Sequence, residues 1–198
     1  MGGSQMGKQS DQGQSMYEAA KAELQKISKD PQEFIQHAYQ NNLTEIQLGQ
    51  LAQQKGQSQD IKQFGQQLAQ NQQTLNDQIT KLAADKNIQL SKQLDARHQK
   101  VLDHFQALAE GDFDKHFTGE QIMAHRRDVA LYQSASQGNT DSDVKSFAQN
   151  SLPTLREQLQ LAQKQATTIN EAAGASRQEQ GGATKENQQK QDQQQQQP

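Results

Sequence analysis

The chain has 198 residues, enough for one domain with flexible ends. Only 31% of the residues are hydrophobic and the mean hydropathy is -1.10. Gln alone supplies roughly a fifth of the chain, far above its ordinary usage. The net charge of -3 and the pI of about 5.9 exclude the general attraction to phosphate backbones on which nucleic-acid binders rely. No apolar stretch is long enough to cross a bilayer, and the absence of Cys excludes disulfides and thiolate chemistry.

Polar tails are predicted at both ends of the chain. Residues 1–15 are rich in Gly, Ser and Gln, and residues 173–198 are Gln-rich and end in the run Gln193 to Gln197, so both segments are expected to be disordered. Apolar residues recur at helical spacing between them, which predicts one helical domain over residues 16–172. Residues 1–15 hold no apolar signal-peptide region, so the sequence as written predicts a cytoplasmic protein.

Capping signals divide this domain into helices. Asp30 followed by Pro31 is typical of a helix start, Ser58 caps the next helix, and Asp141 or Ser142 caps the last one. Gly56, Gly111 and Gly138 mark helix ends. The predicted helices cover residues 16–27, 31–55, 58–85, 91–110, 112–137 and 142–172.

Four of these helices carry a polar residue on an otherwise apolar stripe. In the 58–85 helix, Gln72 completes the series Ile61, Phe64, Leu68, Leu75, Ile79 and Leu82. In the 112–137 helix the stripe is Ile122, His125, Val129 and Tyr132. If the helices pack in one bundle, the polar residues meet at its centre, which we expect to consist of Glu45, Gln72, His125 and Gln158.

An internal repeat indicates how the helices pair. The segment that begins at Glu45 resembles the one that begins at Asp128, and the segment that begins at Asp60 resembles the one that begins at Asp143, both with the same offset. A helical hairpin therefore occurs twice. This predicts an all-α, antiparallel four-helix bundle of the ferritin-like type, made of two hairpins, with the 91–110 helix in the connection.

The polar centre has two chemical interpretations. His125 and Asp128 lie at i and i+3, and Glu45 from the other hairpin would complete one His and two carboxylates, a set that suits a divalent metal such as zinc or iron. Alternatively, His125 is a core histidine hydrogen-bonded to Glu45 or Gln72, and Asp128 is a surface partner for Arg126 or Arg127. The second interpretation is preferred.

Motifs of other enzyme classes are missing from the sequence. The bundle helices lack the Glu-x-x-His pairs of di-iron proteins. Asp95 and His98 have a similar spacing, but they lie in the connecting helix, where a local ion pair is expected. There is no Gly-x-Ser-x-Gly nucleophile motif and no Gly-rich phosphate loop.

Several segments, in order, resemble the bacterial domain-of-unknown-function 4142 family over about residues 31–165. They are Glu45 to Ala52, His125 to Tyr132, and Ser151-Leu152-Pro153-Thr154-Leu155-Arg156-Glu157. The resemblance implies a ferritin-like fold and an exported protein of the periplasm or cell envelope, without an established activity. Members commonly carry His at positions 72 and 158, where this chain has Gln, a poor ligand for transition metals. A family metal cluster is therefore not expected here.

These observations favour a non-enzymatic helical-bundle protein, envelope- or stress-related, with a hydrogen-bonded polar centre and no cofactor. One alternative is a divalent-metal-binding or redox protein that uses Glu45, His125 and Asp128. Another is a Gln-rich interaction or protective protein. No nucleic-acid partner is expected, and the sequence identifies neither a protein partner nor an oligomeric state.

Overall fold

The computed structural model describes the backbone of residues 22–194 and the side chains of residues 22–172. The predicted N-terminal tail, residues 1–15, lies outside the described residues. Within the described range the fold is all-α: residues 22–29 are helical, and five longer helices follow. These are α2 (Pro31–Lys55), α3 (Gln59–Asp85), α4 (Ala96–Ala107), α5 (Glu110–Gly138) and α6 (Ser142–Gln194).

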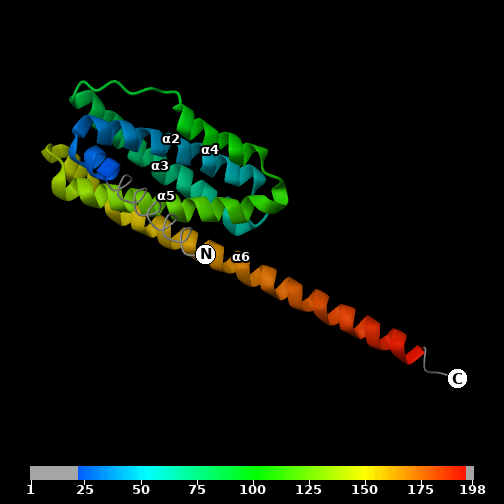
Figure 1. The fold of residues 1–198 in the computed structure, drawn as a ribbon. Helices are drawn as coiled ribbons and strands as arrows, with labels where there is room; N and C mark the ends of the chain where they lie inside the picture. Colours follow the sequence, from blue (N-terminus) through cyan, green and yellow to red (C-terminus); the bar gives the residue numbers. More distant parts are fainter. Residues whose placement is uncertain (1–21, 195–198) are drawn as a thin grey trace, which may run out of the picture.

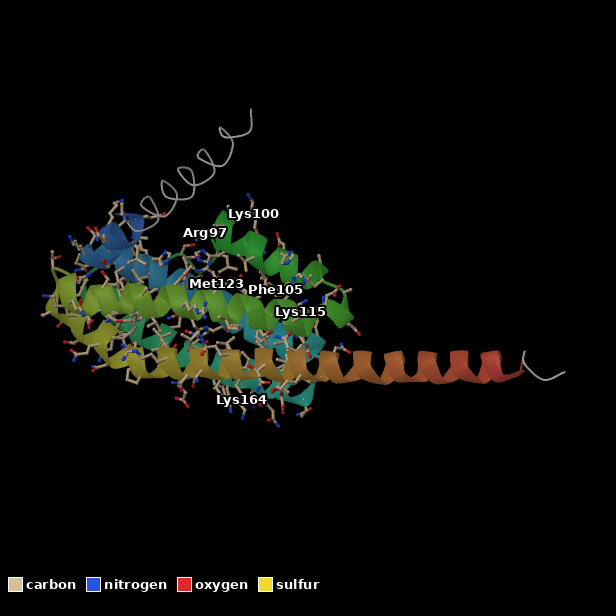
Figure 2. The ribbon with its side chains drawn as sticks, turned by 60° about the horizontal axis from the view of Figure 1, so that its bottom comes forward. Arg97, Lys100, Phe105, Lys115, Met123 and Lys164 are labelled. Carbon is tan, nitrogen blue, oxygen red and sulfur yellow. The ribbon has the colours of Figure 1, made fainter. Side chains whose placement is uncertain are left out.

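The bundle consists of two antiparallel hairpins, as the repeat predicts. α2 packs along α3 and α5 packs along α6, while the hairpins meet through α3 with α6 and α2 with α5. α4, the connecting helix, lies on the outside against α2 (Figure 1). Figure 2 shows α4 beside α5, where Phe105 packs edge-on against Phe113 at 6.0 Å between ring centroids.

Three predicted helix starts are confirmed by their capping bonds. The Asp30 side chain accepts from the backbone N–H of Glu33 at 2.8 Å, and Ser58 Oγ accepts from that of Ile61 at 3.1 Å. Asp141 Oδ1 accepts from the backbone N–H groups of Asp143 and Val144, at 2.9 and 3.1 Å. Each bond satisfies a donor that the helix itself leaves free, so these sequence signals fix where the hairpins turn.

Two glycines bring α2 and α3 into backbone contact. A Cβ atom at Gly65 would lie 2.6 Å from the carbonyl oxygen of Gly49, and one at Gly49 would lie 2.6 Å from the carbonyl oxygen of Gly65. Real Cβ atoms do not approach this closely, so neither position accepts a side chain without the helices moving apart.

The structure corrects the boundaries around α4. This helix begins at Ala96 rather than at Ser91, because the Asp95 side chain accepts from the backbone N–H groups of Arg97 and His98, both at 2.9 Å. α5 begins at Glu110 and contains Gly111, which the sequence placed at a helix end. Burial of the phenylalanines in the first turns of α5 offsets the cost of a helical glycine, about 1 kcal/mol.

The backbone of α6 continues beyond the predicted helical domain. It continues past residue 172 to Gln194, where composition predicts a disordered tail, and its C-terminal part projects away from the bundle (Figure 1).

The core is divided into two apolar clusters by a polar layer. One cluster surrounds Phe34, Tyr132 and Leu155, and the other surrounds Phe64 and Phe117. Between them, each of the four bundle helices contributes buried polar residues. This layer consists of Asn42, Glu45, Gln72, Asn76, Gln121, His125, Asp128 and Gln158.

Candidate functional site

Three of the four residues expected at the polar centre are joined by hydrogen bonds. Gln72 Nε2 donates to Gln158 Oε1 at 3.2 Å, and the same oxygen lies 3.0 Å from His125 Nε2. All three side chains are buried, with exposed fractions of 0% or 1%. This network ties α3 to α6 and α6 to α5, so it crosses the interface between the two hairpins.

Both ring nitrogens of His125 face oxygen acceptors. Nδ1 lies 3.0 Å from the backbone carbonyl oxygen of Gln121, and Nε2 lies 3.0 Å from Gln158 Oε1. Both oxygens are hydrogen-bond acceptors, so a ring nitrogen that carries a proton donates to one of them. To coordinate a metal ion, a ring nitrogen of His125 would have to turn away from these contacts.

Glu45 lies beside this network, and electrostatics couple it to His125. Its side chain is buried, and its Oε2 atom has no hydrogen-bond partner among the described residues. Burial raises the pKa of the Glu45 carboxyl to about 7; the charge of His125 opposes this shift and that of Asp128 adds to it. A buried carboxylate without a cation in contact is costly.

Asp128 points inward, contrary to its preferred interpretation as a surface partner for an arginine. Its side chain is 5% exposed and accepts from Asn41 Nδ2 at 2.8 Å. Burial raises the pKa of the Asp128 carboxyl, and the charges of His125 and His37 oppose that shift. The duplicated hairpin pairs Glu45 with Asp128, so both copies of the repeat place a carboxylate in the polar layer.

A chain of side chains leads from Asp128 to the surface. Asn41 Oδ1 lies 2.8 Å from His98 Nε2, and His98 Nδ1 lies 2.8 Å from Asp95 Oδ2. The predicted local ion pair between Asp95 and His98 is confirmed. This chain also connects α4 to α2, because His98 belongs to α4 and Asn41 to α2.

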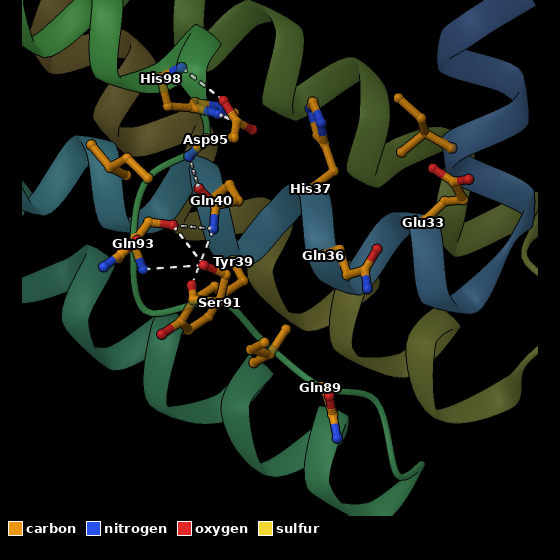
Figure 3. A pocket seen from close by; sticks show the side chains of 13 residues that line it. Glu33, Gln36, His37, Tyr39, Gln40, Gln89, Ser91, Gln93, Asp95 and His98 are labelled. Carbon is orange, nitrogen blue, oxygen red and sulfur yellow. Dashed lines mark hydrogen bonds and ion pairs between the residues drawn. The ribbon is translucent and has the colours of Figure 1, made fainter.

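α4 is fastened to α2 at both ends. At its start, Gln40 Nε2 donates to the carbonyl oxygens of Ser91 and Gln93, and the backbone N–H of Asp95 donates to Gln40 Oε1 (Figure 3). At its end, Lys55 Nζ donates to the carbonyl oxygens of Phe105, Gln106 and Leu108 at 3.3, 2.8 and 2.6 Å. A cation is favourable at a helix C-terminus, so Lys55 acts as a cap for α4.

The metal-ligand set suggested by the sequence is not assembled. Among the described residues, no group of three or more His, Cys, Asp or Glu side chains is arranged to hold a metal ion. Glu45, His125 and Asp128 do belong to the same polar layer. However, His125 directs its nitrogens at oxygen acceptors, and Asp128 bonds to Asn41.

Sequence reasoning missed Asn41, Gln121 and His98 as parts of this site. The predicted α5 stripe was right for His125 and Tyr132, which are buried. It also contained Ile122 and Val129, which are only partly buried, in place of the buried residues Gln121 and Asp128. Gln121 was detectable, since it lies one helical turn before His125 on the same face. The contacts of Asn41 and His98 depend on how α4 docks and have no local sequence signature.

The family model described as Domain of unknown function (DUF4142) matches residues 16–165. The chain belongs to this family. No curated protein matches the sequence significantly. Among solved structures, the crystal structure of a DUF305 fragment from Deinococcus radiodurans is similar, with a TM-score of 0.61 and 14% sequence identity, over 70% of this chain and 97% of that chain.

At this level of identity, the likeness to the DUF305 fragment shows a shared helical fold and nothing of function. The DUF4142 match gives no activity either. No helix in the described part of the chain has the length and apolar character needed to cross a membrane. The function of this DUF4142 protein has therefore to be argued from its own residues.

Proposed function

We propose that this DUF4142 protein is a non-enzymatic helical-bundle protein, in which the network of Gln72, His125 and Gln158 is a structural element rather than a reactive centre. The observation that carries the proposal is the engagement of both His125 nitrogens with acceptor oxygens. The one imidazole in the polar layer is thus committed to holding α5 against α6. An enzyme or a metal protein built on this layer would need that ring to offer a lone pair.

The geometry of the network supports a structural role. Gln72 and Gln158 lie on helices of different hairpins, and their mutual bond fixes how far α3 can slide along α6. Buried polar groups lose free energy when they are left unpaired, so a shift by one helical turn would be disfavoured. The layer therefore sets the register between hairpins whose remaining contacts are apolar and less directional.

An envelope- or stress-related setting is part of the proposal, and its support is the resemblance to exported members of the family. A divalent-metal protein that uses Glu45, His125 and Asp128 is the competing function. It would require His125 to give up one of its hydrogen bonds. The α6 segment beyond residue 172 is a third candidate, as a Gln-rich interaction element, and deleting it tests whether any partner binding depends on it.

Metal analysis of the purified full-length protein separates the first two functions. The protein is incubated with zinc or ferrous iron, dialysed and analysed for bound metal, beside the variants Glu45→Gln and His125→Ala. We expect substoichiometric metal in all three proteins. One tightly held ion per chain that is lost in both variants would establish the metal protein and overturn our proposal.

A further inference from the structure

A cavity between α2, α4 and α5 borders the polar layer. Its volume is about 220 Å³, below the range of pockets that take drug-sized ligands. Its wall includes the buried residues Glu45, Asp128 and Thr44, the small side chain Ala124, and residues of α4. The size and the polar wall fit a small polar molecule.

The inner wall of this cavity is acidic, and among the described residues His125 and His37 act on its carboxylates electrostatically without forming an ion pair. Neither Glu45 nor Asp128 forms an ion pair with a described residue. Both side chains are 5% exposed, and Glu45 Oε2 has no hydrogen-bond partner among the described residues. Because buried carboxylates are normally paired, a positively charged ligand group would be stabilised between them.

The outer wall carries two arginines and one carboxylate, that of Glu120. Arg97 of α4 and Arg127 of α5 both line the cavity (Figure 2 labels Arg97). Arg127 pairs with Glu120 at 2.8 Å, whereas the Arg97 guanidinium forms no hydrogen bond or ion pair within the described part of the chain. A guanidinium presents a fork of donors that matches a carboxylate, so a negative ligand group would be held at this side.

A second hollow continues the cavity toward the 22–29 helix. Its volume is about 180 Å³, and it shares Arg97, Arg127 and Asp128 with the first. Its remaining wall consists of three aliphatic side chains, Leu24, Ile27 and Leu131, together with Glu23 and His37. An aliphatic group attached to a charged ligand would find apolar contacts here.

We propose that this composite cavity binds a free amino acid with an aliphatic side chain. The ammonium group lies between Glu45 and Asp128, the carboxylate lies against Arg97, and the side chain enters the hollow lined by Leu24 and Leu131. This arrangement pairs each charged group of the ligand with the opposite charge on the wall. The inference goes beyond the proposed function, which names no ligand, by assigning a binding site and a class of ligand to this face of the bundle.

Calorimetric titration of the full-length protein with matched small molecules tests the proposed amino-acid site. L-leucine carries all three recognised groups, isoamylamine lacks the carboxylate, isocaproate lacks the amine, and glycine lacks the side chain. We expect saturable binding of one leucine per chain, and at least about tenfold weaker binding of each other probe, since each loses one charged or apolar contact. Equal affinity for leucine and isoamylamine, or no saturable binding of leucine, would overturn the proposal.

Charge-neutralising variants locate the site. Glu45→Gln and Arg97→Gln should each weaken leucine binding by about tenfold or more, and Asp128→Asn replaces the first variant if that protein does not fold. Glu157→Gln and Arg156→Gln remove exposed charges from α6 and should bind leucine normally. Unchanged binding in the cavity variants would refute the assigned site. Leucine binding and metal content are separate readouts, so the ligand site can fail while the proposed non-metal function stands.

Discussion

Replacing Glu45 with Gln should make the protein more stable at neutral and alkaline pH. Burial raises the pKa of this carboxyl from its ordinary 4.5 to about 7. Between these values the folded protein holds a proton that the unfolded chain has released, so the free energy of unfolding falls as the pH rises. At about 1.36 kcal/mol per pKa unit, the difference corresponds to about 3 kcal/mol lost by pH 7 and above.

The glutamine side chain keeps the shape of Glu45 and does not titrate. The variant should therefore equal the parent below about pH 4.5 and exceed it by up to about 3 kcal/mol above about pH 7. The charges that act on Glu45, those of His125, Asp128 and Glu120, are present in both proteins. The direct effects of other titrating groups largely cancel when the two proteins are compared at each pH.

Urea unfolding followed by circular dichroism, at about pH 5 and about pH 8, measures this difference. Glu157→Gln, an exposed position on α6, is the matched control and should show no pH-dependent gain. A Glu45→Gln protein that is destabilised at the higher pH would show that the carboxylate is paired in solution. A gain that is equal at both pH values would show that it does not come from the titration of Glu45, and either result would refute the electrostatic argument.

Three further changes test the packing. His125→Ala leaves the acceptors on Gln158 and Gln121 unpaired, and urea unfolding should show a loss of roughly 1–3 kcal/mol. Gly65→Ala should lower the free energy of unfolding by about 1–3 kcal/mol, because its Cβ would clash with α2. Gly119→Ala is the matched control: its Cβ would contact nothing within 4 Å, and the change should raise the free energy of unfolding by about 0.5–1 kcal/mol. Lys55→Met removes the cap of α4, and hydrogen-exchange mass spectrometry should show faster exchange in that helix; unchanged exchange would show that α4 docks by its apolar contacts.

The parts of the fold that depend on local signals were predictable. Asp30, Ser58 and Asp141 cap the helices that the sequence assigns to them, because a capping bond spans only a few residues. The repeat predicted the two hairpins, and the α3 stripe with Gln72 is buried throughout. The regular spacing of apolar residues on α3 predicted its buried face correctly, because burial favours the same face that the spacing defines.

The parts that depend on tertiary contacts were not predictable. Ser91 and Asp95 are both suitable caps, and Gln40, distant in the sequence, holds the intervening segment outside the helix. On α5 the predicted stripe was right for His125 and Tyr132, but a hydrophobicity rule favoured Ile122 and Val129 over the more deeply buried Gln121 and Asp128. The internal repeat could have predicted the inward position of Asp128, because it aligns this residue with Glu45.

The response of His125 to zinc tests the central claim most directly. Long-range proton–nitrogen NMR spectra of the full-length protein, with His125→Gln to assign the signals, report the state of each ring nitrogen. We expect both nitrogen signals to be unaffected by added zinc, because both nitrogens are held against acceptor oxygens. A nitrogen with a free lone pair whose signal shifts when zinc is added would contradict the structural role assigned to the polar layer.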